Sequence, residues 1–151
     1  MLDKKEFLKF LLKASRNTYA SGKGSMKPLL PGSRQLEYSE GDFLYRDIYN
    51  LGNRKFAGLE TIYLKSKPVW SMSYYGNFEK MTEEEVDKIL RKALTDNWTK
   101  VRLWNKVTYK IGDYTYTNEG SGNIDEFDGG ERIEKNGETI YFFYYASGII
   151  G

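Results

Sequence analysis

The stretch LETIYLKSKPVWSMSYYG, residues 59–76, decides the fold class of this chain. Apolar and polar residues alternate on both sides of a short Lys-Ser-Lys segment, which is typical of two antiparallel strands joined by a tight turn. With the turn at residues 66–67, Trp70 lies opposite Tyr63, and Glu60 falls on the opposite, mostly polar face. The pattern therefore predicts an antiparallel sheet that buries one face.

Trp70 has two interpretations, as a core residue or as a platform for a ligand. Packing in the core is favoured, because apolar residues that alternate along a strand usually face the interior. Tyr75 is predicted to point the other way, beside Ser71 and Ser73. It is a better candidate than Trp70 for a ring that faces a ligand, although an ordinary exposed tyrosine is the favoured interpretation.

Other segments extend the predicted sheet. Residues 43–49, between Gly41 and Gly52, read as a strand, and residues 107–111 and 114–118 pair so that Tyr109 lies opposite Tyr116.

The last predicted hairpin turns at Asn136-Gly137, the preferred type I′ sequence, which predicts Ile133 opposite Ile140 and Arg132 opposite Tyr141. Its final strand, residues 139–146, is apolar or aromatic on both faces, which suits either the centre of the sheet or an interface.

Two helices are indicated by capping signals. Asp3 and Glu6 resemble a capping box before an apolar stripe that ends near Ser15, and Thr82 and Glu85 repeat the pattern. We therefore expect one α+β domain, residues 1–151, with two helices packed on a mainly antiparallel sheet of six or seven strands.

Composition excludes several classes of function. The chain has no His and no Cys, which removes disulfides, imidazole and thiol catalysis and zinc sites built on those residues. The 23 basic and 21 acidic residues nearly cancel, so nucleic-acid binding is disfavoured. Trp98 and Trp104, which alternate with basic residues, more often anchor a connection to the core than stack on bases. We predict neither a metal nor another cofactor.

The first residues carry no targeting signal of the usual kinds. Residues 1–6 are charged, and Lys9 and Lys13 interrupt the apolar positions that follow. This pattern is neither a secretory signal nor a membrane span. The expectations are a cytoplasmic location and no membrane partner.

A resemblance covers most of the chain. It rests on five segments: GSRQLEY at 32–38, YRDIY at 45–49, FAGLE at 56–60, PVWSMSYYG at 68–76 and GDYTY at 112–116. These resemble a family of bacterial and archaeal domains of unknown function, some of which follow a helix-turn-helix DNA-binding module. The resemblance implies a self-contained domain that senses a ligand or a partner, and it transfers no catalytic residues.

Residues 19–34 form a long Gly/Ser/Lys connection after the first helix. Its glycines let backbone amides face one concavity, and Lys23, Lys27 and Arg34 supply positive charge for an anion. The spacing is not that of a P-loop. A solvated mobile loop is the favoured alternative.

Carboxylates offer two weaker signals. The acidic residues of 123–131 suggest a site for calcium or magnesium, but the ligand spacing of an EF-hand is missing and a solvated turn is favoured. Glu60 with Asp47 or Asp128 supplies the paired carboxylates that glycosidase-type acid–base chemistry needs.

Together these patterns favour a non-enzymatic domain that binds a small anionic or aromatic ligand, such as a nucleotide derivative, as a sensor or as a sequestering protein in a cell or a phage. The predicted binding residues are Lys23, Arg34, Tyr38, Trp70 and Tyr75. The first alternative is a protein-interaction or homo-oligomeric module that uses Tyr141, Phe143 and Tyr145 as its interface. The second is a carboxylate-dependent hydrolase.

Overall fold

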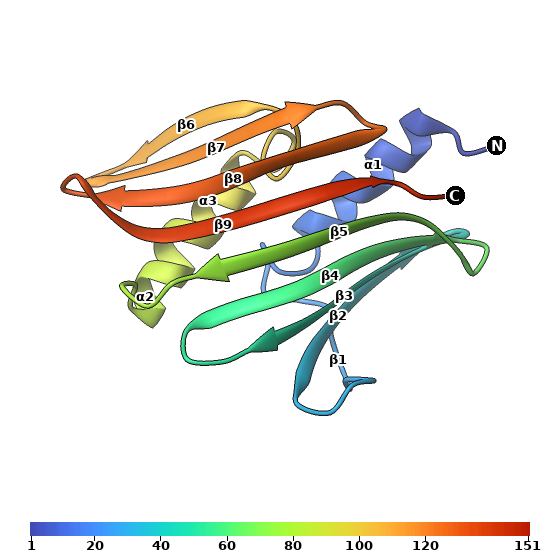
Figure 1. Ribbon diagram of the computed structural model, residues 1–151, viewed down its shortest axis with the longest axis horizontal. Helices are drawn as coiled ribbons and strands as arrows, with labels where there is room; N and C mark the ends of the chain where they lie inside the picture. The colour runs from blue at the N-terminus through green and yellow to red at the C-terminus, as the bar shows by residue number, and fades with distance from the viewer.

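A single antiparallel sheet of nine strands dominates the computed structural model, which describes residues 1–151 (Figure 1). The strands are β1 Ser25–Met26, β2 Ser33–Glu40, β3 Phe43–Leu51, β4 Lys55–Leu64, β5 Lys67–Asn77, β6 Lys106–Ile111, β7 Tyr114–Gly122, β8 Glu126–Lys135 and β9 Glu138–Ile149. Their order is β1-β2-β3-β4-β5-β9-β8-β7-β6. Two meanders thus meet at the β5–β9 pair, so β5 is the central strand and β9 lies directly beside it.

The predicted α+β class with six or seven strands is wrong. The protein is mostly β, with nine strands and only about 18% of its residues in helices. The sequence patterns missed β1 and β2. In β2 the buried side chains are Ser33 and Gln35, which bond to the carbonyl of Leu30 and the amide of Leu29. Polar residues on a buried face conceal the alternation that indicates a strand.

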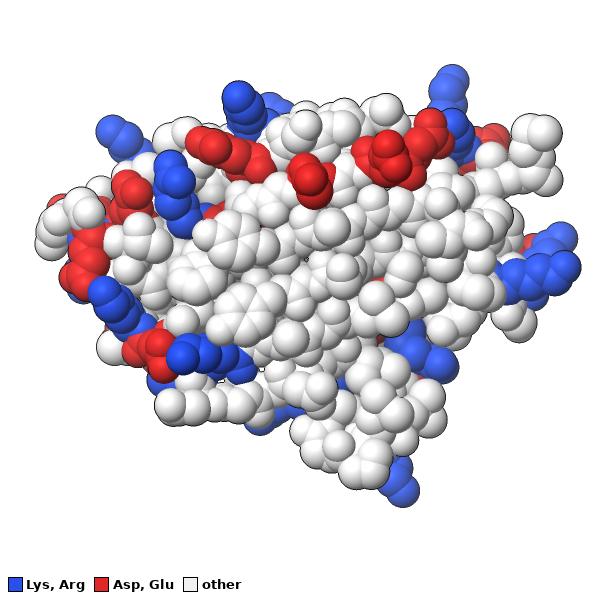
Figure 2. All heavy atoms as spheres, viewed as in Figure 1, with Lys and Arg blue, Asp and Glu red and all other residues white.

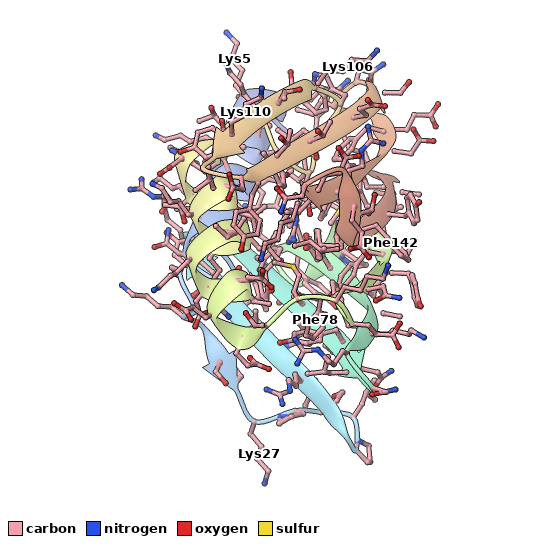
Figure 3. The ribbon with its side chains drawn as sticks, turned by 90° about the vertical axis from the view of Figure 1, so that its left-hand side faces the viewer. Lys5, Lys27, Phe78, Lys106, Lys110 and Phe142 are labelled. Carbon is pink, nitrogen blue, oxygen red and sulfur yellow. The ribbon has the colours of Figure 1, made fainter.

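The helices cover one face of the sheet and leave the other open (Figures 1 and 3). The first, α1, spans Lys4–Arg16, and Asp3 caps it by accepting from the amides of Lys5 and Glu6 at 2.9 and 3.1 Å. Its start confirms the predicted N-terminus, because the carboxylate satisfies amides that have no partner within the helix.

The second helical segment connects the two meanders. It comprises α2 Glu83–Glu85, the π turn η1 Val86–Leu90 and α3 Arg91–Asp96. The predicted capping box is confirmed: the Glu85 amide donates to the Thr82 hydroxyl at 3.1 Å, and the Thr82 amide donates to the Glu85 carboxylate at 2.8 Å. Of the apolar residues that follow this cap at helical spacing, Ile89, Leu90, Ala93 and Leu94 are buried and Val86 is half-buried. No helix in the structure has both the length and the apolar character that crossing a membrane requires.

The register of the β4–β5 hairpin differs from the prediction by one residue. Lys65 and Ser66, with φ angles of 49° and 65°, form the turn, and a bulge follows. Trp70 therefore lies opposite Ile62, and Met72 lies opposite Glu60. A shift of one residue moves a whole strand to the other face. Glu60, predicted to face solvent, is instead 6% exposed on the face that the helices cover.

The final hairpin turns where predicted, but its register also shifts. Asn136 and Gly137 both have positive φ, as a type I′ turn requires. A bulge at Ile133 then places Tyr141, rather than Ile140, opposite Ile133, so both predicted cross-strand pairs are wrong. The pairing of Tyr109 with Tyr116 on β6 and β7 is confirmed.

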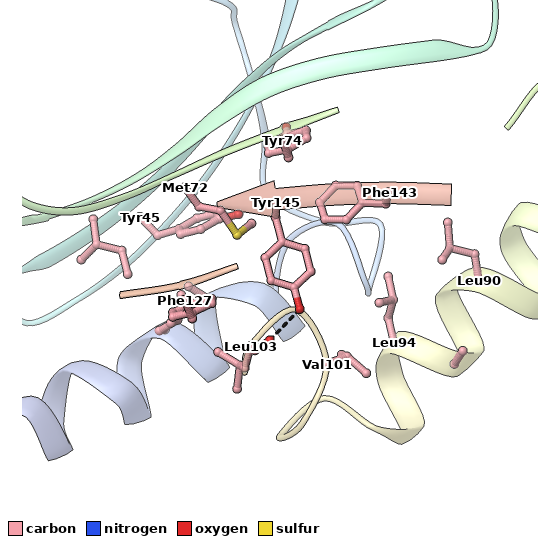
Figure 4. Close-up of a cluster of buried hydrophobic side chains, with 14 of the residues drawn as sticks. Tyr45, Met72, Tyr74, Leu90, Leu94, Val101, Leu103, Phe127, Phe143 and Tyr145 are labelled. Carbon is pink, nitrogen blue, oxygen red and sulfur yellow. Dashed lines mark hydrogen bonds between the residues drawn. The ribbon is translucent and has the colours of Figure 1, made fainter. Parts of the chain in front are cut away.

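The core lies between the helices and the sheet and is rich in aromatic rings. Trp70, 1% exposed, packs between Phe7 of α1 and Phe127 of β8, at centroid distances of 6.1 and 6.3 Å. This confirms its interpretation as a core residue. Figure 4 shows the neighbouring cluster, in which the Tyr145 hydroxyl donates to the carbonyl of Leu103 at 2.6 Å and so ties the connection after α3 to β9.

The cap of the second helical segment predicts the effect of one substitution. Replacing Thr82 with Ala leaves the Glu85 amide without its acceptor, so the free energy of unfolding should fall by about 1 kcal/mol in urea titrations. Thr99→Ala, in an exposed turn, is the control and should change it by less than about 0.5 kcal/mol. Equal effects of the two changes would contradict a stabilising role for the cap.

Candidate functional site

A cavity of about 250 Å³, here called the chamber, lies between the sheet and the second helical segment. Strands β2 to β5 and β9 form one wall, and residues 83–91 with Arg102 form the other. Its lining comprises Tyr19, Arg34, Asp47, Tyr49, Leu51, Phe56, Glu60, Tyr74, Phe78, Glu83, Val86, Arg91, Arg102 and Phe143. Figure 3 views the molecule from the end at which Phe78 lies, with the helices on one side of the sheet.

Two carboxyl groups face each other inside the chamber. Asp47 on β3 is the direct cross-strand partner of Glu60 on β4, and the two residues are 4% and 6% exposed. Direct partners on antiparallel strands hold their Cβ atoms about 5 Å apart. The Tyr74 hydroxyl of β5 donates to Asp47 Oδ1 at 2.5 Å. The strand register therefore brings two acids and a phenol together on a buried face.

The environment of this pair favours its protonated forms. Burial raises the pKa of Asp47 to about 6, against the hydrogen bond from Tyr74 and the charge of Arg102. Burial, and then the neighbouring charge of Asp47, raise the pKa of Glu60 to about 8. The two groups interact, so near neutral pH the pair holds about one proton.

Arg102, in the connection between α3 and β6, supplies a fixed positive charge beside the pair. Its Nε donates to Glu131 Oε1 at 2.9 Å, and its guanidinium lies 4.3 Å from the ring centroid of Phe143. Burial would lower the pKa of Arg102, but the Glu131 carboxylate raises it well above its ordinary value. Glu131, whose side chain is fully buried, also accepts from the hydroxyls of Tyr116 and Tyr141.

A second hollow of about 320 Å³, here called the vestibule, adjoins the chamber. The two share Tyr19, Arg34, Tyr49 and Arg91 in their linings. The vestibule is lined by Lys23, Arg34 and Arg91 and by no carboxylate. Arg91 pairs with Asp87, whereas Lys23 and Arg34 have no ion-pair partner. The vestibule is therefore a basic entrance to a chamber that contains acids.

The structure brings together only part of the predicted binding set. Lys23 and Arg34 share the vestibule. The ring of Tyr38 packs against Phe10 of α1, and its hydroxyl donates to Glu40 of β2 at 2.9 Å, while Trp70 lies in the core. Tyr75, 42% exposed, is on the uncovered side of the sheet. The rings in the chamber are therefore not those that the sequence patterns indicated.

The predicted interface residues lie in the core. Tyr141, Phe143 and Tyr145 are 1%, 1% and 4% exposed on the covered face. They leave little surface for a partner. The side chains of β9 on the uncovered side include those of Phe142, Tyr144 and Ala146 (Figure 3 labels Phe142).

Of the predicted carboxylates, Asp47 and Glu60 lie next to each other as cross-strand partners. Asp128 is not with them: it is exposed and lines an open groove with Tyr144. Sequence reasoning missed Arg102 and Glu131 as site residues. A signal existed for Glu131, because it is in phase with the buried Phe127 and Ile133 along β8. A charged residue at a core position indicates a buried partner of opposite charge.

The tryptophans of the connection have structural contacts. Trp104 packs edge-on against Phe127 at 5.4 Å, which confirms its predicted anchoring role. The guanidinium of Arg16 lies over the ring of Trp98 at 5.1 Å.

A protein-family model for a domain of unknown function, DUF5680, matches residues 47–150. The chain belongs to the DUF5680 family. This confirms the resemblance to a domain of unknown function, while the bacterial and archaeal range and the link to helix-turn-helix modules stay predictions. The DUF5680 match includes the acids Asp47, Glu60 and Glu131 and the cation Arg102, but it excludes Lys23 and Arg34 of the vestibule. Neither the curated proteins nor the solved structures contain a match.

The paired acids predict how stability depends on pH. Folding raises the pKa of Glu60 from 4.5 to about 8, so its contribution is complete below pH 4.5 and is lost as the pH rises through 8. Glu60→Gln keeps a neutral side chain at every pH. At pH 8.5 it should raise the free energy of unfolding by about 2 kcal/mol or more, with a much smaller effect at pH 5.

Urea unfolding of both proteins between pH 5 and 8.5 measures this difference. Asp128→Asn, an exposed carboxyl on the other face, is the control and should follow the pH dependence of the wild type. A Glu60→Gln protein that is equally destabilised at all pH values would show that Glu60 is ionised in the folded protein.

Proposed function

We propose that this DUF5680 domain binds a small molecule whose anionic end lies in the vestibule and whose polar, ring-containing end enters the chamber. The observation that carries the proposal is a set of ionisable side chains that line one cavity, the buried acids Asp47 and Glu60 and the partly buried Arg102. Burying charged groups is costly, and replacing them with apolar residues often stabilises a fold. Perturbed groups in a cavity are more frequent at binding and catalytic sites.

The charge of the vestibule supports an anionic group at the outer end. Lys23 and Arg34 lack acidic partners there, and a guanidinium recognises phosphate or carboxylate through paired hydrogen bonds. At the inner end an ionised Asp47 accepts a hydrogen bond, and a protonated Glu60 donates one. A nucleotide derivative has this pattern, with a charged phosphate and a base that both donates and accepts.

Aromatic walls support a planar inner group. Tyr19 and Tyr49 stand at the junction of the two hollows, and Phe143 lies deeper. Aromatic faces pack against planar ligands, and Arg91 and Arg102 already lie over the ring of Tyr19 at 5.1 and 5.4 Å. In this proposal Tyr19 and Tyr49 take the role that the sequence patterns suggested for Tyr38, Trp70 and Tyr75. The domain would act as a sensor or as a sequestering protein.

Paired probes test the anionic end. AMP should raise the melting temperature of the protein saturably and bind more tightly than adenosine in calorimetric titrations. Arg34→Gln should weaken AMP binding by about tenfold and leave adenosine binding unchanged, because one charged hydrogen bond is lost. Arg132→Gln, an exposed arginine on β8, is the matched control. A panel of nucleotides and anionic metabolites that leaves the melting temperature unchanged at millimolar concentration would contradict the proposal.

A second candidate function, homodimer formation, is favoured by the uncovered side of the sheet. This open face, defined here by Leu59, Tyr75, Phe142 and Tyr144, has an uncharged centre, and acidic side chains gather over β7 and β8 (Figure 2). Leu59 and Tyr144 are 49% and 59% exposed. Two such faces pack as a β-sandwich when a two-fold axis relates them. The partner in this proposal is a second copy of the chain.

Sedimentation velocity tests the homodimer. The double substitution Tyr75→Ser with Tyr144→Ser should convert a dimer into a monomer and leave cooperative unfolding intact, since both side chains are exposed. Leu30→Ser, which removes an exposed apolar residue from the loop before β2, should leave the dimer unchanged. A wild-type protein that sediments as a monomer at high micromolar concentration would exclude this function.

A further inference from the structure

We infer that the chamber is also a proton-transfer site, at which Asp47 removes a proton from a carbon next to a carbonyl group and Glu60 returns one to the enolate. This inference rests on the proposed binding of a small molecule in the chamber and goes beyond it, because it assigns a reaction. The class of reaction is enolisation, which interconverts or racemises carbonyl compounds.

The placement of the two acids supports this step. Cross-strand pairing holds Asp47 and Glu60 side by side on the same buried face, and both line the chamber. One small ligand therefore has adjacent atoms within reach of both carboxyl groups. The Tyr74 hydroxyl orients Asp47 through its 2.5 Å hydrogen bond. A positioned base and a positioned acid on neighbouring atoms are what enolisation needs.

The other side chains of the chamber restrict the chemistry. The lining contains no Ser, Thr or Lys, and the chain has no His or Cys. Serine, threonine, lysine, histidine and cysteine nucleophiles are therefore absent from the chamber, and proton transfer is the chemistry that we assign to its carboxyl groups.

Arg102 provides the charge that an enolate requires. Glu131 and Tyr141 bind its Nε and Nη2, at 2.9 and 3.5 Å, while Nη1 has no hydrogen-bond partner in the protein. The guanidinium is held in place before a ligand arrives, and it lines the chamber. A preorganised donor of this kind stabilises the negative oxygen that develops as the C–H bond breaks.

The step balances without a co-reactant. The carboxylate of Asp47 takes the proton, the electron pair of the C–H bond becomes a C=C bond, and the carbonyl oxygen becomes an enolate beside Arg102. Protonated Glu60 then gives its proton to this oxygen, which forms the enol, or to the carbon that lost its proton. The pair holds one proton before and after the step, on Glu60 at the start and on Asp47 at the end. Transfer of that proton from Asp47 to Glu60 restores the starting state.

The ionisation of the pair agrees with these roles. The pKa values are about 6 for Asp47 and about 8 for Glu60, so at a pH between these values Asp47 is a carboxylate and Glu60 is protonated. The groups that face the pair are Tyr45 of β3, Tyr74 of β5, Arg102 of the connection and Glu131 of β8. The other titratable groups of the chamber are Tyr19, Arg34, Tyr49, Glu83 and Arg91. The rate should therefore follow a bell-shaped pH profile with a maximum near pH 7.

Hydrogen–deuterium exchange tests the inference. The full chain is incubated in D₂O with dihydroxyacetone phosphate or pyruvate, and loss of the C–H signals is followed by proton NMR. We expect exchange above the buffer rate, with Asp47→Asn and Glu60→Gln each reducing it by at least about 100-fold. Asp128→Asn should not change it. Circular dichroism and thermal melts check that each variant is folded.

The outcomes separate the two proposals. Exchange that persists in a folded Asp47→Asn, Glu60→Gln double variant would overturn the proton-transfer site. Probes that raise the melting temperature but show no catalysed exchange would overturn it as well and would leave the binding function standing. If no probe or nucleotide binds and none exchanges, both proposals fail.

Discussion

The ion pair between Arg102 and Glu131 is the interaction on which the rest of this structure depends. It joins the connection after α3 to strand β8, and two tyrosine hydroxyls complete the shell around the carboxylate. Removing one partner of such a buried pair leaves an uncompensated charge, which costs about 3–5 kcal/mol. The pair therefore holds the connection against the sheet. It also fixes a positive charge at the wall of the chamber, which offsets part of the rise that burial causes in the pKa of Asp47 and of Glu60.

The chamber exists because charged groups enter a face that is otherwise packed with aromatic rings. Trp70 and its neighbours fill the α1 end of the covered face, while Asp47 and Glu60 occupy core positions near the second helical segment. Asp47 and Glu60 have too few hydrogen-bond partners to form a purely structural network, because the strongest donor nearby, Arg102, bonds to Glu131 instead. The loop before β2 adds an entrance whose charge is opposite to that of the paired acids. A ligand with two chemically different ends fits this arrangement.

The two faces of the sheet separate two kinds of function. The covered face holds the chamber and the core, so its aromatic residues on β9 are committed to packing. The open face has exposed rings from β5 and β9 in an uncharged surface. Neighbouring residues of one strand therefore serve different purposes, because successive side chains point to opposite faces. A homodimer through the open face leaves the entrance of the chamber free, so the two proposed functions do not compete for surface.

The sequence alone determined the features that act over a few residues. These are the two helix caps, the strands with clear alternation, the turn at Asn136-Gly137, the core position of Trp70, and the exclusion of His and Cys chemistry. The number of strands and the site depended on tertiary structure. The polar buried face of β2 has no hydrophobic signal, and Lys65-Ser66 lacks the Asn-Gly signature of the turn that it forms. That turn and the bulges set the register, and a shift of one residue turned Glu60 from solvent toward Asp47. Strand β9 and the connection that carries Arg102 are distant in sequence from β2 to β5, so only their packing could reveal the chamber.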